Sequence, residues 1–390
     1  MPSAEKTKED IERFLVSFQE ALQFWSNSVK SQLSNKSNDK KTISTTNNTT
    51  TTDKASEEGL LASSKLETPV LELPKLAKLL NMHATKIGLV FKPPLDPSSH
   101  TARYTELENA SKTMILLYSL LSQLINEKET YSSLFVGQCV EVCRGLTTNF
   151  ISLSSEVAIL MNNTIEETED KEAEEQEQEQ EQEGKDRLIS IAKIWESCDS
   201  IQNLVKLGSA GILKGKLKGA NQLVNDALEE FEEWVEDPTS GFNDDDDDDP
   251  FQLNRGFDEP TTKDNNTDDE DEDEVDEELL KFAKIWVQKV KLIKLLLTSL
   301  DKSIPANKYT TKFSSRVDLL NSYQSSISEV LDDVVGSIIY EQDLEAAIES
   351  SEKLKTVCSK IVTSVKELNN SDPKRCKWLD TWQVKFLESK

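Results

Sequence analysis

The stretch IWESCDSIQNL, residues 194–204, is where this sequence gathers side chains that could do chemistry. It places Trp195, Glu196, Cys198 and Asp199 within five positions. A cysteine nucleophile needs a general base within hydrogen-bonding reach, and the base needs a group that orients it. The sequence has two histidines, both far from this stretch: His83 and His100. We therefore assign no catalytic residue here.

A helical projection of the same stretch indicates a structural role. At 100° per residue, one face carries five residues, and Asp199 lies at its edge while Glu196 points away. The five are Leu188, Ile191, Ala192, Trp195 and Cys198. Tryptophan and free cysteine are commonly buried for packing alone. We expect Trp195 and Cys198 to be core residues and Asp199 to be hydrogen-bonded at a helix interface.

Two further stretches resemble ligand sites but lack essential parts. Cys139 and Cys143 in QCVEVC have helical i, i+4 spacing, yet no third or fourth zinc ligand lies nearby, so core packing is expected. In GSAGILKGKLKG, three residues separate Gly211 from Gly215 and Leu217 follows the lysine, which excludes a phosphate-binding P-loop. We expect no metal and no cofactor.

The glycine-rich stretch is better explained as a turn between two antiparallel helices. It carries a dense group of lysines, which we keep as a possible interaction surface for an acidic partner or an acidic part of the chain itself. These are Lys206, Lys214, Lys216 and Lys218.

Long amphipathic segments dominate the rest of the chain. Apolar residues recur at spacings of three and four, and glycine and proline are scarce, at 12 and 11 of 390 residues. This pattern predicts an all-α protein of long antiparallel helices in bundles, with disordered polar and acidic insertions. We expect an N-terminal bundle over 1–162 with an insertion at 34–68, an acidic linker at 163–184, and a C-terminal bundle over 185–390 with an acidic insertion at 237–276.

The net charge of −27 resides in two tracts. Residues 162–184 carry 11 acids and one lysine, and residues 236–278 carry 21 acids and two basic residues, which leaves +2 for the remainder. Acidic tracts repel phosphates, so direct nucleic-acid binding is disfavoured. No apolar run is long enough to cross a membrane, and no secretory signal is visible, so the five cysteines indicate a reducing compartment.

Three segments together resemble a known family. They are ISIAKIWESCDSIQNL, LVNDALEEFEEWVED and, after an acidic break, FAKIWVQKVKLIKLLLTSLDKSI. Their order resembles the cyclin-D-binding protein family, also called GCIP, best over residues 185–303. The resemblance implies a helical, non-enzymatic regulator of cell-cycle progression and transcription, found in nucleus and cytoplasm. Its implied partners are cyclin-like or helix-loop-helix proteins.

Two other functions compete with this one. The acidic tracts are compatible with a chaperone for basic proteins such as histones. Bundles of long helices also occur in vinculin-like cytoskeletal adaptors, an analogy of fold alone. Both are binding functions, so the sequence favours a protein-interaction role over an enzyme.

Overall fold

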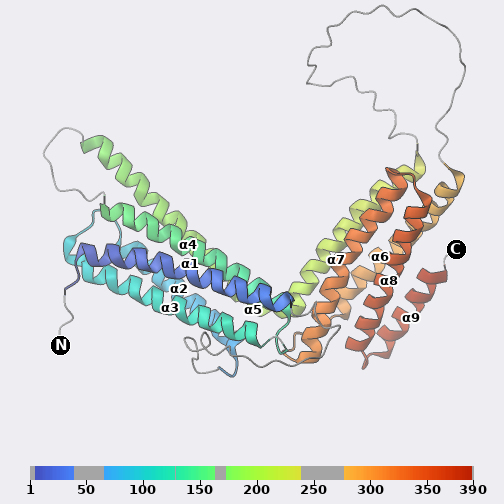
Figure 1. Cartoon of the computed structure of the whole chain (residues 1–390), viewed down its shortest axis with the longest axis horizontal. Helices are drawn as coiled ribbons and strands as arrows, with labels where there is room; N and C mark the ends of the chain where they lie inside the picture. The colour runs from blue at the N-terminus through green and yellow to red at the C-terminus, as the bar shows by residue number, and fades with distance from the viewer. Residues whose placement is uncertain (1–4, 39–65, 128, 163–172, 239–275, 389–390) are drawn as a thin grey trace, which may run out of the picture. The chain divides into compact units, whose positions relative to one another are not determined.

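A computed structural model of the chain describes residues 5–38, 66–127, 129–162, 173–238 and 276–388 (Figure 1). These residues form α-helices and one short 3-10 helix, with no strand among them, so the all-α prediction is confirmed. The elements are α1 (Lys8–Asn38), α2 (Pro69–Val90), η1 (Pro97–Ser99), α3 (His100–Asn126), α4 (Ser133–Asn162), α5 (Ala173–Glu236), α6 (Glu277–Ser303), α7 (Thr311–Ile339), α8 (Leu344–Leu368) and α9 (Pro373–Glu388).

The helices pack into two compact units. Unit 1 comprises residues 1–212 and 307–315, and unit 2 comprises 213–306 and 316–390. The predicted boundary, with the second bundle beginning at residue 185, is wrong, because residues 185–212 pack with α1–α4. The reason is their apolar stripe: Ile191, Ile194, Cys198 and Ile201 are buried in the same cluster as the core of α1–α4.

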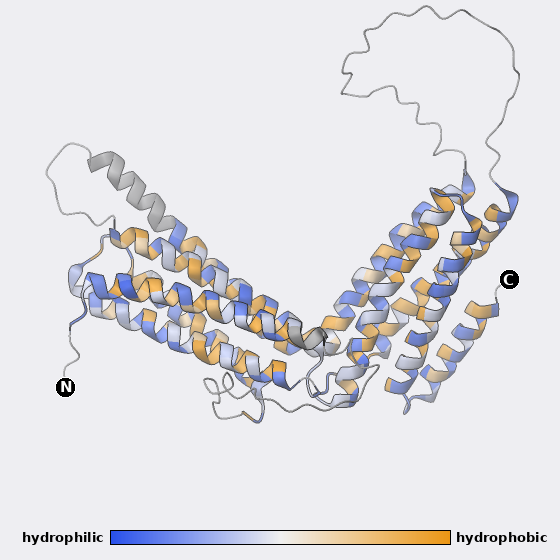
Figure 2. Ribbon diagram, in the orientation of Figure 1, coloured by the Kyte–Doolittle hydropathy of each residue, from blue (hydrophilic) through white to orange (hydrophobic). Residues whose placement is uncertain are grey.

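Unit 1 is a closed ring of five helices, in the order α1, α3, α2, α5, α4. Aromatic pairs join α1 to its neighbours: Phe14 to Tyr104 of α3, with ring centroids 5.2 Å apart, and Phe18 to Phe150 of α4, 6.5 Å apart. Polar contacts between the other neighbours are His83 to Glu106 (α2 and α3), Trp195 to Thr85 (α5 and α2) and Asn149 to Ser197 (α4 and α5). Each helix therefore buries its stripe against at least two others, and α3 also contacts α4. Figure 2 shows that every helix it colours contains both hydrophobic and hydrophilic residues.

Two of the predicted insertions differ from the structure at their edges. The backbone of α1 continues to Asn38, and residues 39–65 of the predicted polar insertion lie outside the described residues. Residues 173–184 of the predicted acidic linker are helical, as the start of α5, because glutamate and glutamine are good helix formers. Residues 239–275 of the second acidic insertion lie outside the described residues.

One residue, Gly208, interrupts α5. Its φ of 58° and ψ of −175° lie in a region that is essentially restricted to glycine. A Cβ at this position would lie 2.5 Å from Cγ of Asn307. The Asn307 Oδ1 accepts hydrogen bonds from Ser209 Oγ (2.7 Å) and from the Ala210 backbone N–H (3.3 Å), so it caps the helix that resumes after the interruption. The predicted pair of helices is thus present, and the turn between them is reduced to a kink at one non-helical residue, Gly208.

Unit 2 contains the end of α5 together with α6, α7, α8 and α9. Lys291 of α6 pairs with Glu232 of α5 at 2.6 Å, and Arg316 of α7 pairs with Glu367 of α8. Both α6 and α8 contact the short helix α9. The apolar face of α9 consists of Leu379, Trp382 and Phe386, all buried.

The docking of α9 includes a buried lysine. Lys289 of α6 is 3% exposed, and its Nζ donates a 3.0 Å hydrogen bond to the carbonyl of Phe386 in the last turn of α9. The same Nζ lies 5.6 Å from the ring centroids of Trp286 and Phe386. Burial lowers the pKa of Lys289 below its ordinary value. A helix C-terminus and aromatic faces both attract a cation, so this position partly compensates a buried charge.

We expect Gly208→Ala to lower the free energy of unfolding by about 1–3 kcal/mol, because alanine is strained at this φ and ψ and its Cβ meets Asn307. Urea unfolding followed by circular dichroism measures the change. Gly215→Ala is the matched control, since it lies in the same helix with nothing within 4 Å of an added Cβ. The free energy of unfolding of this control should increase by about 0.5–1 kcal/mol. A higher free energy of unfolding in both variants would contradict the prediction that alanine is strained at position 208.

A second prediction concerns the contact of α5 with α2. A Cβ at Gly88 would lie 2.4 Å from Ile191 Cδ1, so the larger side chain of Gly88→Leu must displace Ile191 from its place against α2, at a cost of about 1–3 kcal/mol. Gly145→Leu on α4, which is exposed with no neighbour within 4 Å, should be neutral or stabilising. Hydrogen exchange of α5 amides should accelerate in the first variant only; equal exchange in both variants would mean that the close approach is unimportant.

A third prediction concerns pH. The pKa of Lys289 is lowered in the folded state, so there is a pH range in which the folded chain has lost this proton and the unfolded chain still binds it. Over that range the free energy of unfolding increases as pH rises. Relative to Lys289→Met, the stability of the chain should therefore increase as the pH rises toward the ordinary lysine pKa of about 10.4. At neutral pH the free energy of unfolding of Lys289→Met should lie within about 1 kcal/mol of that of the parent chain, or exceed it, because an apolar side chain replaces a buried charge. Urea unfolding across this range tests it, with exposed Lys377→Met as control; a stability difference that is flat or falls with pH would refute it.

Candidate interaction surfaces

Trp195 is not a core residue. Its side chain is 40% exposed, and Leu188, on the same predicted face, is 54% exposed. The buried face of this part of α5 is instead centred on Ile194 and Cys198, both 0% exposed. The predicted face was therefore displaced by about one residue. Because Leu188, Ile189 and Trp195 add apolar residues outside the buried stripe, periodicity alone did not identify which side faces inward.

A hydrogen bond holds Trp195 at the seam between α5 and α2. The indole Nε1 donates to Thr85 Oγ1 at 3.1 Å, and the same hydroxyl donates to the carbonyl of Asn81 at 2.9 Å. The ring is thus tied to the neighbouring helix while part of it stays exposed. A fixed, half-exposed tryptophan is typical of residues that anchor protein–protein contacts, because little side-chain entropy is lost on binding.

Exposed apolar residues flank Trp195 on both helices. The contacts of Thr85 with Trp195 and of Gly88 with Ile191 show that α2 and α5 run antiparallel. Met82 and Leu89 lie three and four residues from Thr85, and Leu188 lies two turns before Trp195, so all point to the outer side of the seam. Their exposed fractions are 41% for Met82, 68% for Leu89, 54% for Leu188 and 40% for Trp195. We call these four residues the α2–α5 apolar surface.

The other residues of the same stretch do not form a catalytic group. Cys198 is fully buried, as predicted, and burial raises the pKa of its thiol to about 12. A thiol of such high pKa is a poor nucleophile at neutral pH. Asp199 is exposed and accepts a 3.2 Å hydrogen bond from Gln202 of its own helix, so its predicted place in the structural core, at a helix interface, is wrong.

Cys139 and Cys143 lie in the core of α4, each 1% exposed. Burial raises the pKa of the Cys143 thiol to about 12 and raises that of Cys139 well above its ordinary value. Within the described residues, no three histidine, cysteine or acidic side chains come together as a metal site requires.

The four lysines of the predicted basic surface are close in sequence but do not share one face. Lys206 belongs to unit 1, whereas Lys214, Lys216 and Lys218 belong to unit 2. Lys214 and Lys218 lie one turn apart, and Lys216 projects roughly 200° away from Lys214 around the helix. Their role as a binding surface stays a prediction.

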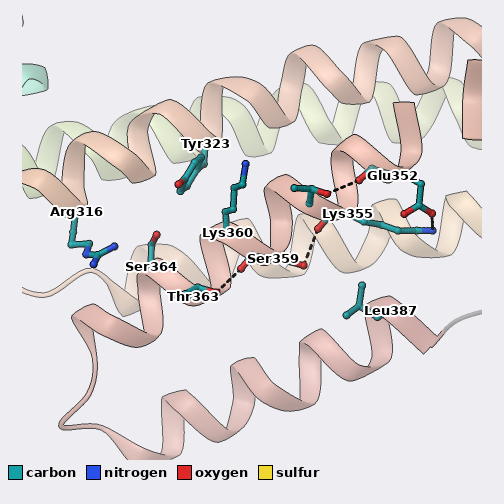
Figure 3. A pocket seen from close by; sticks show the side chains of 10 residues that line it. Arg316, Tyr323, Glu352, Lys355, Ser359, Lys360, Thr363, Ser364 and Leu387 are labelled. Atoms are coloured by element: carbon teal, nitrogen blue, oxygen red, sulfur yellow. Dashed lines mark hydrogen bonds and ion pairs between the residues drawn. The ribbon is translucent and has the colours of Figure 1, made fainter. Parts of the chain in front are cut away.

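Unit 2 has a groove between α7 and α8, about 490 Å³ in volume, that the sequence reasoning missed (Figure 3). Its cationic lining is Arg316 from α7 and Lys355 and Lys360 from α8, and Leu387 of α9 lies at one side. The other lining residues are Tyr323, Glu352, Thr356, Ser359, Thr363 and Ser364. Hydroxyl residues at spacings of three and four on α8 were the available signal, because they mark a polar stripe beside the buried apolar one.

None of the described helices contains an apolar stretch long enough to cross a bilayer.

Comparison with known proteins matches residues 72–237, which span most of α2 through α5, to the family model "Grap2 and cyclin-D-interacting, N-terminal". The matched region includes all four residues of the α2–α5 apolar surface.

Two fungal relatives match most of the chain. The uncharacterized protein YLR287C of Saccharomyces cerevisiae is 31% identical over 334 residues, which cover 84% of this chain and 88% of the relative. The uncharacterized protein C22E12.18 of Schizosaccharomyces pombe is 23% identical over 333 residues, covering 83% of this chain and 87% of the relative. With the match over residues 72–237, they establish that this chain is a member of the Grap2 and cyclin-D-interacting (GCIP) protein family.

Proposed function

We propose that this protein is a non-enzymatic interaction factor that binds a D-type cyclin or a related helical regulator through the α2–α5 apolar surface. The observation that carries the proposal is the exposed Trp195, tied to Thr85 by a 3.1 Å hydrogen bond and flanked by exposed Leu89 and Leu188. Apolar side chains grouped on one face of a soluble protein commonly mark a binding site.

The family match supports the choice of partner. The matched model carries cyclin-D interaction in its description, and its region contains the helices that form this surface. A role in cell-cycle progression and transcription, exercised in nucleus and cytoplasm, is part of the same proposal. Helix-loop-helix regulators, the other partner class expected from the resemblance, would be bound at the same surface.

The two competing functions lack an observation of comparable kind. The histone-chaperone alternative depends on the acidic tracts, most of whose residues lie outside the described ranges. The vinculin-like alternative depends on the helical fold alone, which unrelated functions share.

The test compares binding of purified D-type cyclin to the intact chain and to Leu89→Ser/Trp195→Ser by titration calorimetry. Both residues are exposed, so the variant should keep its helical circular dichroism. We expect at least about tenfold weaker binding, because an anchoring tryptophan commonly contributes 2 kcal/mol or more.

The control is Phe24→Ser. Phe24 is 70% exposed on α1, whose neighbours in the ring are α3 and α4, so its loss removes exposed apolar area from a different surface. Equal weakening in control and variant would contradict the assigned surface. Absence of cyclin binding by the intact chain, with histones bound instead, would overturn the proposed function.

A further inference from the structure

The groove of unit 2 collects hydrogen-bond donors from two helices. Arg316 and Tyr323 lie two turns apart on α7, and Lys360 and Ser364 lie one turn apart on α8. The four side chains project into the space between the two helices (Figure 3).

Three of these four polar groups have no partner among the described residues. The ammonium of Lys360 and the hydroxyls of Tyr323 and Ser364 make no hydrogen bond or ion pair there. Ser364 is only 4% exposed, so little water reaches it except through the groove. Arg316 pairs with Glu367 through one Nη, and its guanidinium has further N–H donors. The groove therefore contains hydrogen-bond donors that lack an acceptor among the described residues.

Other hydroxyls of the lining already donate elsewhere. Thr356, Ser359 and Thr363 each donate to the backbone carbonyl four residues earlier, at 3.0, 2.9 and 3.0 Å. Their protons are engaged, and their small side chains leave the groove open. The attraction that the groove exerts on a ligand thus comes mainly from its cations.

The charges of the groove favour an anion. Lys355 pairs with Glu352 at 2.5 Å and Arg316 pairs with Glu367, so the three cations of the lining meet two carboxylates. Lys360 has no anionic partner among the described residues and supplies the excess positive charge. Residues 355–364 of α8 span about 13 Å at 1.5 Å per residue. Alternate side chains of an extended peptide are about 7 Å apart, so side chains at positions i, i+2 and i+4 span the same length.

We propose that this groove binds an extended acidic peptide segment of a partner protein, whose carboxylates at alternate positions meet Arg316 and Lys360. The site goes beyond the proposed cyclin interaction, because its lining belongs to unit 2 and is charged where the α2–α5 surface is apolar. Charge complementarity is the reason for an acidic partner, and the shape of the groove is the reason for an extended one.

The test uses the full chain and a fluorescent peptide, Asp-Ser-Asp-Ser-Asp, with Asn-Ser-Asn-Ser-Asn as the uncharged control. Anisotropy at about 0.15 M salt should show binding of the acidic peptide alone, weakening as salt rises. Lys360→Glu should weaken binding about fivefold or more, since it replaces an attraction by a repulsion. Lys353→Glu is the matched control, because this exposed lysine lies on the same helix outside the groove and changes the net charge equally.

A second version of the chain tests whether the larger of its two acidic tracts occupies the groove. Residues 236–278 carry a net charge of −19, so residues 239–275 are replaced by a glycine/serine linker of equal length. Binding by both versions, sensitive to Lys360→Glu and insensitive to Lys353→Glu, supports the proposal. Binding only after the replacement would assign the groove to the chain's own acidic segment and overturn a partner peptide. Absence of binding in both versions, or equal loss in the two lysine variants, would overturn the site. Cyclin binding is measured separately, so the two proposals fail independently.

Discussion

Closure of unit 1 by the first half of α5 is the contact on which the rest of the structure depends. Helices α1–α4 leave a seam between α2 and α4, and Ile191, Ile194 and Cys198 of α5 fill it. Gly88 gives room to the end of the Ile191 side chain, because an added Cβ would lie 2.4 Å from Ile191 Cδ1. Burial of apolar side chains supplies the driving force, at about 1.5–3 kcal/mol for each large residue.

The same closure produces the apolar surface. A helix that packs between two others buries one stripe of residues and leaves the residues beside that stripe partly exposed. In α5, Leu188 and Trp195 are such residues. The groove of unit 2 has a different origin. Serine and threonine residues of α8 have small side chains, so space remains between them and the longer cationic side chains of the lining. One molecule thus offers an apolar surface and a cationic groove, which suit partners of different chemistry.

Isolated polar contacts set the register of helices whose apolar faces alone would allow sliding. In unit 1, Tyr118 and Thr147 share a buried 2.5 Å hydrogen bond between α3 and α4, and burial raises the pKa of Tyr118. In unit 2, Trp382 of α9 donates to the Leu292 carbonyl at 2.8 Å. A buried donor without its acceptor costs about 1–3 kcal/mol, so each pair disfavours a shifted packing.

The sequence by itself determined the fold class, most helix positions, the burial of Cys198 and the family, because helical periodicity and segment order are local properties. Only the tertiary structure decided that residues 185–212 complete unit 1, that Trp195 is half exposed, and that Arg316 and Lys360 meet in one groove. The reason is physical: α5 is apolar on more than one side, so its inward face depends on which neighbouring helices offer a complementary surface. The groove joins residues from three consecutive helices, α7, α8 and α9, and no pattern within one helix records which side chains of the others lie beside it.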